Sequence, residues 1–253
     1  MRQIFWTEEL LHTEIKHYNP AYEGGAKFQI ESGKPVIVVL ADQKVDNIKC
    51  LAGIPLIAVD LSGTNVADLG PLKGLPLQEV MLERTRVTDL TPLKGAPIEK
   101  LYLSNTPVVS LAGLEGMPLQ ELNLVSTKVT DITPIAQSPI QMLWLTDCPI
   151  ENIAPLSKVP LVSVTLHRTK VKDLSPLSGT ALQRLHIAET PVDDLSPLKG
   201  MGLTRLVFTP ANIKKGLDVA RALPVREIGT RFEDSGNDLA PPDVFWAAQP
   251  ATK

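Results

Sequence analysis

The chain has 253 residues, 43% of them hydrophobic and 21% charged, with a formal net charge of −3 at pH 7. Acidic and basic residues are interleaved, so no strong positive patch favours binding to nucleic acid or anionic lipid. No stretch approaches the roughly 20 apolar residues of a membrane span, and the N-terminal segment lacks the apolar region of a signal peptide. We therefore expect a cytoplasmic protein that binds neither nucleic acid nor membranes.

A helix is predicted near the N-terminus. Thr7 suits the N-cap position, and Glu8 and Glu9 follow in the first turn, where the helix dipole favours negative charge. The helix should end at Asn19, which precedes a proline. Because an array of repeats exposes apolar surface at its ends, we assign residues 1–34 to an N-terminal helical cap.

From about residue 35 to residue 203 the sequence repeats itself every 21 residues. Such self-similarity is typical of a solenoid, in which each repeat packs only on its neighbours. The first position of the repeat is apolar throughout, at Leu56, Leu77, Ile98, Leu119, Ile140, Leu161, Leu182 and Leu203. Positions 4 and 6 are also apolar and alternate with polar or variable residues, which predicts a short strand with one buried face.

Two polar positions recur after each strand. Position 9 is threonine in all but one complete repeat, where Cys148 replaces it, and we expect its inward hydroxyl to satisfy a backbone group that would otherwise be unpaired. Position 13 is aspartate at Asp68, Asp89, Asp131, Asp173 and Asp194. A row of carboxylates could attract calcium, but one ion needs six or more oxygens. We favour the alternative, in which each aspartate accepts a local backbone N–H.

A tight helical turn is predicted after the aspartate. A hydroxyl residue directly before proline, as in Thr91-Pro92, suits an N-cap followed by proline at the first helical position. A glycine such as Gly95 then ends the turn, where a left-handed residue is wanted. Each repeat is thus expected to be a short strand, a corner, one helical turn and a return.

The pattern LxxLxLxxTxVxDLSPLxGxP resembles the leucine-rich repeat family and is close to its bacterial internalin-type subclass. The resemblance spans roughly residues 35–223, with threonine where the family usually has asparagine at position 9 and with a slightly shorter repeat. It implies a right-handed α/β solenoid with a parallel sheet of about nine or ten strands on the concave face and short helical turns on the convex face. A weaker likeness, to leucine-rich repeat segments behind bacterial serine/threonine kinase domains, rests on the T-x-V-x-D-L-S-P-L wording and on residues 19–24.

The repeat pattern breaks down after Val207. Residues 214–223 predict a longer helix in place of the tight turn, and residues 225–228 a last strand. Residues 233–237 resemble a loop, and residues 241–246 predict a short helix that lays Phe245 and Trp246 over the last repeat. We assign residues 35–224 to a solenoid of eight to nine repeats and residues 225–253 to a C-terminal cap and tail.

Few residues suggest a disulfide, a metal site or a catalytic role. Cys50 and Cys148 lie five repeats apart, roughly 24 Å at the spacing of neighbouring strands, so we expect no disulfide between them. His167 and His186 are diagonal neighbours on the sheet, about 7–8 Å apart, but a metal ion would need further ligands and a metal site is not favoured. No catalytic triad, phosphate-binding loop or CxxC pair is present. We expect no catalytic residue, no metal and no cofactor.

The outward face of the sheet carries the strongest functional signal. Positions 3, 5 and 7 point away from the core there, and position 5 places Tyr102 and Trp144 on it. Single apolar residues are ordinary on a surface, but aromatic, Met and Arg side chains gathered on one face with a charged rim are typical of an interaction hot spot. The expected binding residues are Met81, Glu83, Arg84, Tyr102, Asn123, Met142, Trp144, His167, Arg168 and His186.

We therefore expect a monomeric, non-catalytic module that binds a protein or peptide through the concave face of a leucine-rich repeat solenoid. One alternative is a regulatory or targeting arm of a larger signalling protein such as a serine/threonine kinase. Another is a hydrolase acting on carbohydrate, which would need paired carboxylates at the centre of the inner face. Position 5 supplies only Asp60 for that role.

Overall fold

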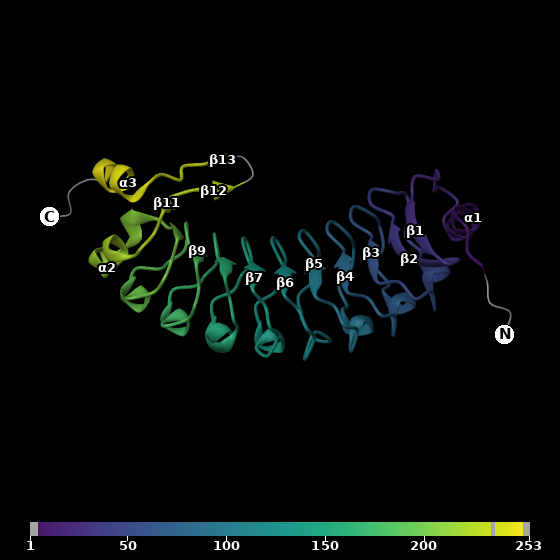
Figure 1. Ribbon diagram of the computed structural model, residues 1–253, viewed down its shortest axis with the longest axis horizontal. Helices are drawn as coiled ribbons and strands as arrows, with labels where there is room; N and C mark the ends of the chain where they lie inside the picture. The colour runs from purple at the N-terminus through teal and green to yellow at the C-terminus, as the bar shows by residue number, and fades with distance from the viewer. Residues whose placement is uncertain (1–4, 234–235, 250–253) are drawn as a thin grey trace. The chain divides into compact units, whose positions relative to one another are not determined.

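The computed structural model describes residues 5–233 and 236–249, which form two compact units that divide between Val129 and Thr130 (Figure 1). The first unit contains helix α1 (Glu8–Tyr18) and strands β1 (Lys27–Glu31), β2 (Lys34–Val39), β3 (Ala58–Asp60), β4 (Glu79–Met81), β5 (Lys100–Tyr102) and β6 (Glu121–Asn123). The second contains strands β7 (Met142–Trp144), β8 (Ser163–Thr165), β9 (Arg184–His186), β10 (Arg205–Val207), β11 (Glu227–Gly229), β12 (Phe232–Glu233) and β13 (Gly236–Asn237), with helices α2 (Leu217–Ala222) and α3 (Pro242–Ala248).

Short 3-10 turns connect the strands and lie along the side opposite to the sheet within each unit (Figure 1). The first unit has turns at Lys49–Leu51, Gly70–Leu72 and Thr91–Leu93. The second has turns at Thr133–Ile135, Ala154–Lys158, Ser175–Leu177, Ser196–Leu198 and Pro210–Asn212. Most repeats are thus a strand, a corner and a helical turn, as the 21-residue pattern predicts, and the segment between β5 and β6 has no 3-10 turn.

Within the repeats, residues that pair across neighbouring parallel strands are 21 positions apart in the sequence, which is the period of the repeat. Ala58 of β3 pairs with Glu79 of β4, and Glu79 pairs with Lys100 of β5. The second unit follows the same rule, since Ser163 of β8 pairs with Arg184 of β9. Equivalent residues of successive repeats therefore lie beside each other, and the predicted parallel solenoid is confirmed.

The core consists of columns of buried Leu, Ile and Val side chains, one column for each apolar position of the repeat. In one repeat, Ile98, Leu101, Leu103 and Val108 are all 0% exposed. At position 9 the threonine hydroxyl turns inward and donates to a backbone carbonyl three residues earlier, for example from Thr64 to Leu61 at 2.6 Å. The same bond recurs at Thr85, Thr106, Thr169 and Thr190, which confirms the predicted role of this column.

The aspartates at position 13 cap the turns, and the predicted N-cap is wrong. Oδ1 of Asp131 accepts the N–H of Thr133 at 2.8 Å, and Asp68, Asp89, Asp173 and Asp194 make the equivalent bond. The hydroxyl residue before proline is therefore the first residue of the 3-10 turn, not its N-cap. The aspartate two residues earlier accepts the N–H of the hydroxyl residue itself, which is a different donor from those that an N-cap hydroxyl would accept.

The N-terminal cap contains the predicted helix and one strand that was not predicted. The N–H of Leu10 donates to Oγ1 of Thr7 at 3.2 Å, and α1 ends before Asn19. The Asn19 amide nitrogen donates to the carbonyl of Asn47, and its oxygen accepts from the backbone N–H groups of Asp46 and Asn47. These bonds fasten the cap to the first repeat. Strand β1 pairs antiparallel with β2, so the described sheet order begins one strand earlier than expected.

The C-terminal cap follows the prediction in outline. Helix α2 and strand β11 form where a helix and a last strand were expected, and α3 places Phe245 6.1 Å from Phe208 between ring centroids. Trp246 also packs on Phe208, and the Arg221 guanidinium lies 4.3 Å from a Trp246 ring. The segment expected to be a loop instead contributes β12 and β13, which pair with each other.

Two other expectations concern the chain as a whole. Neither cysteine forms a disulfide in the part of the chain that the structure describes. Within the same ranges, no helix combines the length and the apolar character needed to cross a bilayer.

Two isoleucines test the core columns. Ile98 is 0% exposed, whereas Ile57 is 37% exposed. Ile98→Ala should lower the free energy of unfolding by about 2–5 kcal/mol, because it removes buried methyl groups and leaves a cavity. Ile57→Ala should cost much less. Chemical denaturation of both variants measures the difference, and equal losses would contradict the assignment of these positions.

Asp131 tests the turn caps. Hydrogen bonds from the side chain and the backbone N–H of Thr133 lower the pKa of the Asp131 carboxyl. Its contribution to stability is therefore present above the ordinary pKa of 3.8 and is lost as the pH falls through the lowered value. Asp131→Ala should destabilise the protein at pH 7 and by less near pH 2.

Asp131→Asn is the matched control, because Asn152 already accepts the equivalent bond from Ala154. This variant should stay close to the wild type at pH 7. Thermal melts at both pH values compare the three proteins. An alanine variant as stable as the wild type at pH 7 would show that the cap contributes nothing.

Candidate interaction surface

The outward residues of the first unit's sheet remain accessible. In β3, β4, β5 and β6 the middle residue of each strand is buried and the two flanking residues are half-buried. Met81, Tyr102 and Asn123 therefore point away from the core, as the alternation of side chains along a strand requires. We call the outward side chains at positions 3, 5 and 7 of the repeats that contain β3–β6 the first open face.

Tyr102 is held in place on this face by a carboxylate. Its hydroxyl donates to Oε2 of Glu121 at 2.5 Å, and the Lys100 ammonium lies 3.6 Å from Oε1 of the same residue. Burial, together with the hydrogen bond and the negative charge of Glu121, raises the pKa of the Tyr102 phenol. The ring is therefore neutral and fixed in orientation, with its apolar faces available for packing.

The first open face is acidic. Glu79, Glu83 and Glu121 all lie on it half-buried, and Lys100 is the basic side chain among them. Glu83 accepts the hydroxyl hydrogen of Ser104 at 2.5 Å, so its carboxylate has a fixed position. Met81 lies on β4 between Glu79 and Glu83 in the sequence. The face therefore combines apolar and negatively charged groups.

The outward residues of the second unit fall into two groups. Met142 and Trp144 of β7 are half-buried on the outward side, as expected. In β8, β9 and β10, by contrast, the last residue is buried, and Val207 of β10 is 0% exposed. The face of the second unit is therefore open at β7 and covered at β8–β10.

Two predicted binding residues lie in the covered part. His186 is 2% exposed and His167 is 4% exposed, so the expectation that both are surface residues is wrong. Their ring centroids are 5.4 Å apart. They do face the outward side of the strands, as the repeat register requires, but another part of the chain covers them.

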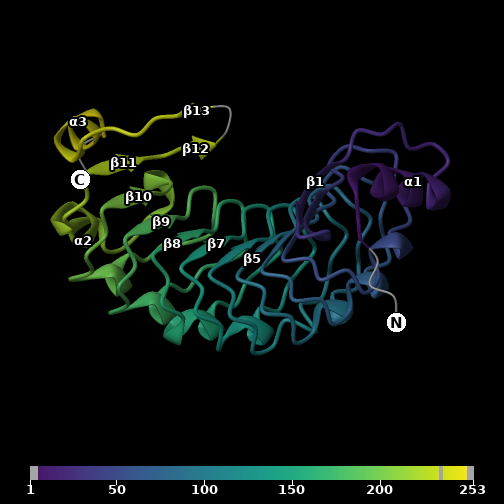
Figure 2. The ribbon, with the colours of Figure 1, turned by 45° about the vertical axis from the view of Figure 1, so that its right-hand side comes forward.

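The cover is the segment that follows β11, which turns back over the sheet (Figures 1 and 2). The Phe232 ring packs edge-on against His186 at 4.8 Å between centroids. The Arg205 guanidinium lies 4.9 Å from the Phe232 ring centroid, a cation–π contact that links the segment to β10. We call the residues Thr230–Phe232 the covering arm.

The corners after the strands form a charged rim. Their first exposed residue adopts a left-handed conformation, with φ between 53° and 61° at Arg84, Asn105, Ser126, Asp147, Arg168 and Glu189. In the first unit, Nη2 of Arg84 reaches Oδ1 of Asp42 at 3.3 Å. Gly63 occupies the corner between them, where a Cβ atom would lie 2.0 Å from that oxygen. The glycine thus lets this ion pair form across two repeats.

Arg168 makes the rim contact of the second unit. Its Nε and Nη2 atoms donate to the two carboxylate oxygens of Asp147 at 2.6 and 3.0 Å, and Nη1 lies 3.7 Å from Glu189. The hydrogen bonds from Arg168 lower the pKa of Asp147. Both predicted rim arginines, Arg84 and Arg168, are exposed.

The sequence reasoning missed two sets of residues on these faces. Position 3 supplies Glu79, Lys100 and Glu121, which surround Tyr102; the same period-2 alternation that identified position 5 also identifies position 3. The contact of Phe232 and Arg205 carries no repeat signal, because Phe232 lies beyond the last repeat. No feature of the sequence alone could have found it.

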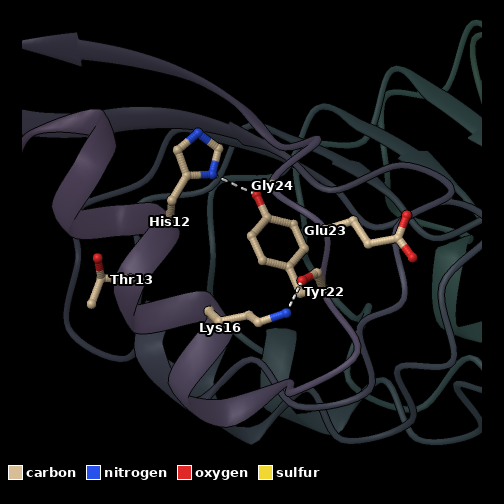
Figure 3. A pocket seen from close by; sticks show the side chains of 6 residues that line it. All are labelled: His12, Thr13, Lys16, Tyr22, Glu23 and Gly24. Carbon is tan, nitrogen blue, oxygen red and sulfur yellow. Dashed lines mark hydrogen bonds between the residues drawn. The ribbon is translucent and has the colours of Figure 1, made fainter.

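The cap of the first unit contains a separate pocket of about 410 Å³. Figure 3 shows His12 and Lys16 of α1 directed toward Tyr22. Nδ1 of His12 lies 2.7 Å from the Tyr22 hydroxyl, which also accepts the N–H of Ala26 at 2.9 Å, and Nζ of Lys16 donates to the Tyr22 carbonyl. These groups satisfy one another and fasten α1 to the segment that leads into β1.

The described residues offer no metal centre, since no group of three or more His, Cys, Asp or Glu side chains within them is arranged to hold an ion. The aspartate row accepts backbone N–H groups instead, as described above. The His167–His186 pair has no third ligand of this kind beside it in the same described ranges.

Comparisons with known proteins agree with this architecture. No family model and no curated protein matches the sequence. Among solved structures, an internalin C2 from Listeria monocytogenes matches with a TM-score of 0.68 and 22% identity, over 81% of this chain and 95% of that one. An internalin F from the same species matches with a TM-score of 0.61 and 20% identity, over 88% of this chain and 75% of that one. The parallel strands, the 3-10 turns and these neighbours together show that the chain has the leucine-rich repeat solenoid fold.

Proposed function

We propose that the chain is a non-catalytic recognition module that binds a protein or peptide through the open parts of its sheet. The observation that carries the proposal is the half-exposed state of Tyr102 and Trp144, each in a repeat whose inward residues are fully buried. Aromatic side chains in such positions are the commonest anchors of protein interfaces. The structural neighbours, two internalins, support a module of this fold and leave its partner open.

The side chains around the two rings suit an adaptable contact. Met81 lies on the first open face and Met142 beside Trp144 on β7. Methionine is unbranched and polarisable, so it fits partners of different shape. In the first unit Asn123, Glu83 and Arg84 complete the proposed contact set, and in the second unit Arg168 does. His167 and His186 are not part of the set while the covering arm lies over them.

The charge of the first open face indicates the chemistry of the partner. Glu79, Glu83 and Glu121 outnumber Lys100 there, so a partner segment that carries Lys or Arg beside an apolar residue would be complementary. Such a contact would weaken as salt screens the charges. The alternative, a regulatory or targeting arm of a larger signalling protein, would use the same surface and remains a prediction from sequence.

Alanine substitutions on the sheet test the proposal. Tyr102→Ala and Trp144→Ala, made singly and together, should each weaken capture of the partner, because truncating a hot-spot residue costs about 2 kcal/mol or more, roughly 30-fold in Kd. Both side chains are half-exposed, so thermal melts should change little. The measurement is quantitative affinity capture with the intact chain as bait, followed by titration of the captured protein.

Val109 and Val244 provide the matched control, since both are 56% exposed and lie outside the sheet strands. The double variant Val109→Ala/Val244→Ala should bind as the wild type does. A photo-crosslinking residue placed at Asn123 should attach to the partner, and one placed at Val109 should not. Equal capture by the wild type and the Tyr102/Trp144 double variant would overturn the proposed surface.

A further inference from the structure

The covering arm contacts the sheet through one aromatic side chain, Phe232, which packs against His186 and Arg205. Its ends are fixed: Oδ1 of Asp238 accepts the N–H groups of Thr230 and Arg231 at 2.8 and 2.7 Å. Ile228 and Ala240 exchange backbone hydrogen bonds at 3.0 and 2.9 Å. Beyond these anchors, Phe232 pairs with Asn237 and its ring rests on His186. A segment that meets the sheet through one side chain can open locally at a lower free energy than the core.

The residue beneath the arm is poorly satisfied. His186 is 2% exposed, and neither of its ring nitrogens has a hydrogen-bond partner among residues 5–233 and 236–249. Buried polar groups are nearly always hydrogen-bonded, so an exception needs an explanation. Open water would satisfy both nitrogens, and it reaches them only when Phe232 moves away. The closed arrangement therefore leaves both ring nitrogens of His186 without hydrogen bonds, and the open arrangement lets water supply them.

The charged groups around His186 also disfavour its protonated form. Arg184 lies on the same strand, Arg205 on β10, and His167 follows β8 at 5.4 Å between ring centroids. The described carboxylates nearby are engaged elsewhere, Glu227 by Arg205 at 2.5 Å and Asp238 by the backbone of the arm. An imidazolium at this position would thus face cations without a carboxylate to balance it.

We propose that Phe232 is a proton-controlled plug, and that protonation of His186 releases the covering arm and uncovers the sheet face at β9. Release exposes His186, on which the Phe232 ring rests. The accessible face of the second unit would then extend beyond β7. This inference concerns the chain's own conformation and does not depend on the proposed partner binding.

The direction of the pH effect follows from the two states of His186. Burial, followed by the charges of His167, Arg205 and Arg184, lowers its pKa to about 3 in the closed form. In the open form it returns toward 6.5. Between these values the open form binds more protons, so falling pH favours opening. The open-to-closed ratio should rise about 30-fold between pH 7.5 and pH 5.0.

A fluorine probe at Phe232 tests the plug directly. The full chain with 4-fluorophenylalanine at this position should give a ¹⁹F signal of a packed ring at pH 7.5. The solvent-exposed signal should grow at pH 5.0. In the variant His186→Leu, and in His186→Gln as a second neutral replacement, the packed signal should persist at both pH values. The variant His17→Gln, which changes an exposed histidine of α1, should behave as the wild type does.

The histidine itself gives a second readout. In Phe232→Ala the imidazole of His186 should titrate near pH 6.5 by NMR, whereas in the wild type its midpoint should lie well below that value. An unchanged ¹⁹F signal between pH 7.5 and pH 5.0 in the wild type would overturn the proposal. So would a pH response that survives both His186 replacements, or a wild-type His186 that already titrates near 6.5.

Discussion

Backbone pairing between residues 21 positions apart is the constraint on which the rest of this structure depends. Because Ala58 pairs with Glu79 and Glu79 with Lys100, each side chain lies beside the residue at the same position of the next repeat. A polar group that turns inward must then be satisfied within its own repeat, because its neighbour needs the same partner. The threonine hydroxyls meet this condition by donating to carbonyls three residues earlier. The aspartates meet it at the corners by accepting N–H groups two residues later.

Features that recur in most repeats could be predicted from the sequence, because each was observed several times. The strand, the buried columns, the threonine bond and the aspartate bond all belong to this class. One recurrent residue was assigned to the wrong place: Thr133 is the first residue of the turn rather than its N-cap, and Asp131 accepts its backbone N–H. A hydroxyl residue before proline suits either place, and only the geometry of the corner decides between them.

Features that occur once could not be predicted in the same way. Strand β1 pairs antiparallel with β2 and has no counterpart in the repeats. His186 points outward as its position requires, but whether it meets water depends on Phe232, which lies beyond the periodic sequence. The alternation of side chains along a strand determines the direction in which each one points. Its exposure depends also on where the segments outside the repeats pack. The accessibility of Tyr102 and Trp144 was therefore predicted correctly, and that of the two histidines wrongly.

The left-handed corners have a consequence for how such a chain can vary. A residue with a Cβ atom costs roughly 1–2 kcal/mol in this conformation. Glycine avoids this cost, and Gly63 occupies the equivalent corner of the repeat that contains β3. The other corners from Arg84 to Glu189 keep side chains in spite of it. Since the neighbouring backbone holds each corner in shape whatever residue is there, its identity is free to differ from repeat to repeat. The corners that carry side chains can thus differ in sequence without a change in the framework, whereas residue 63 is restricted to glycine by the nearby Asp42 carboxylate.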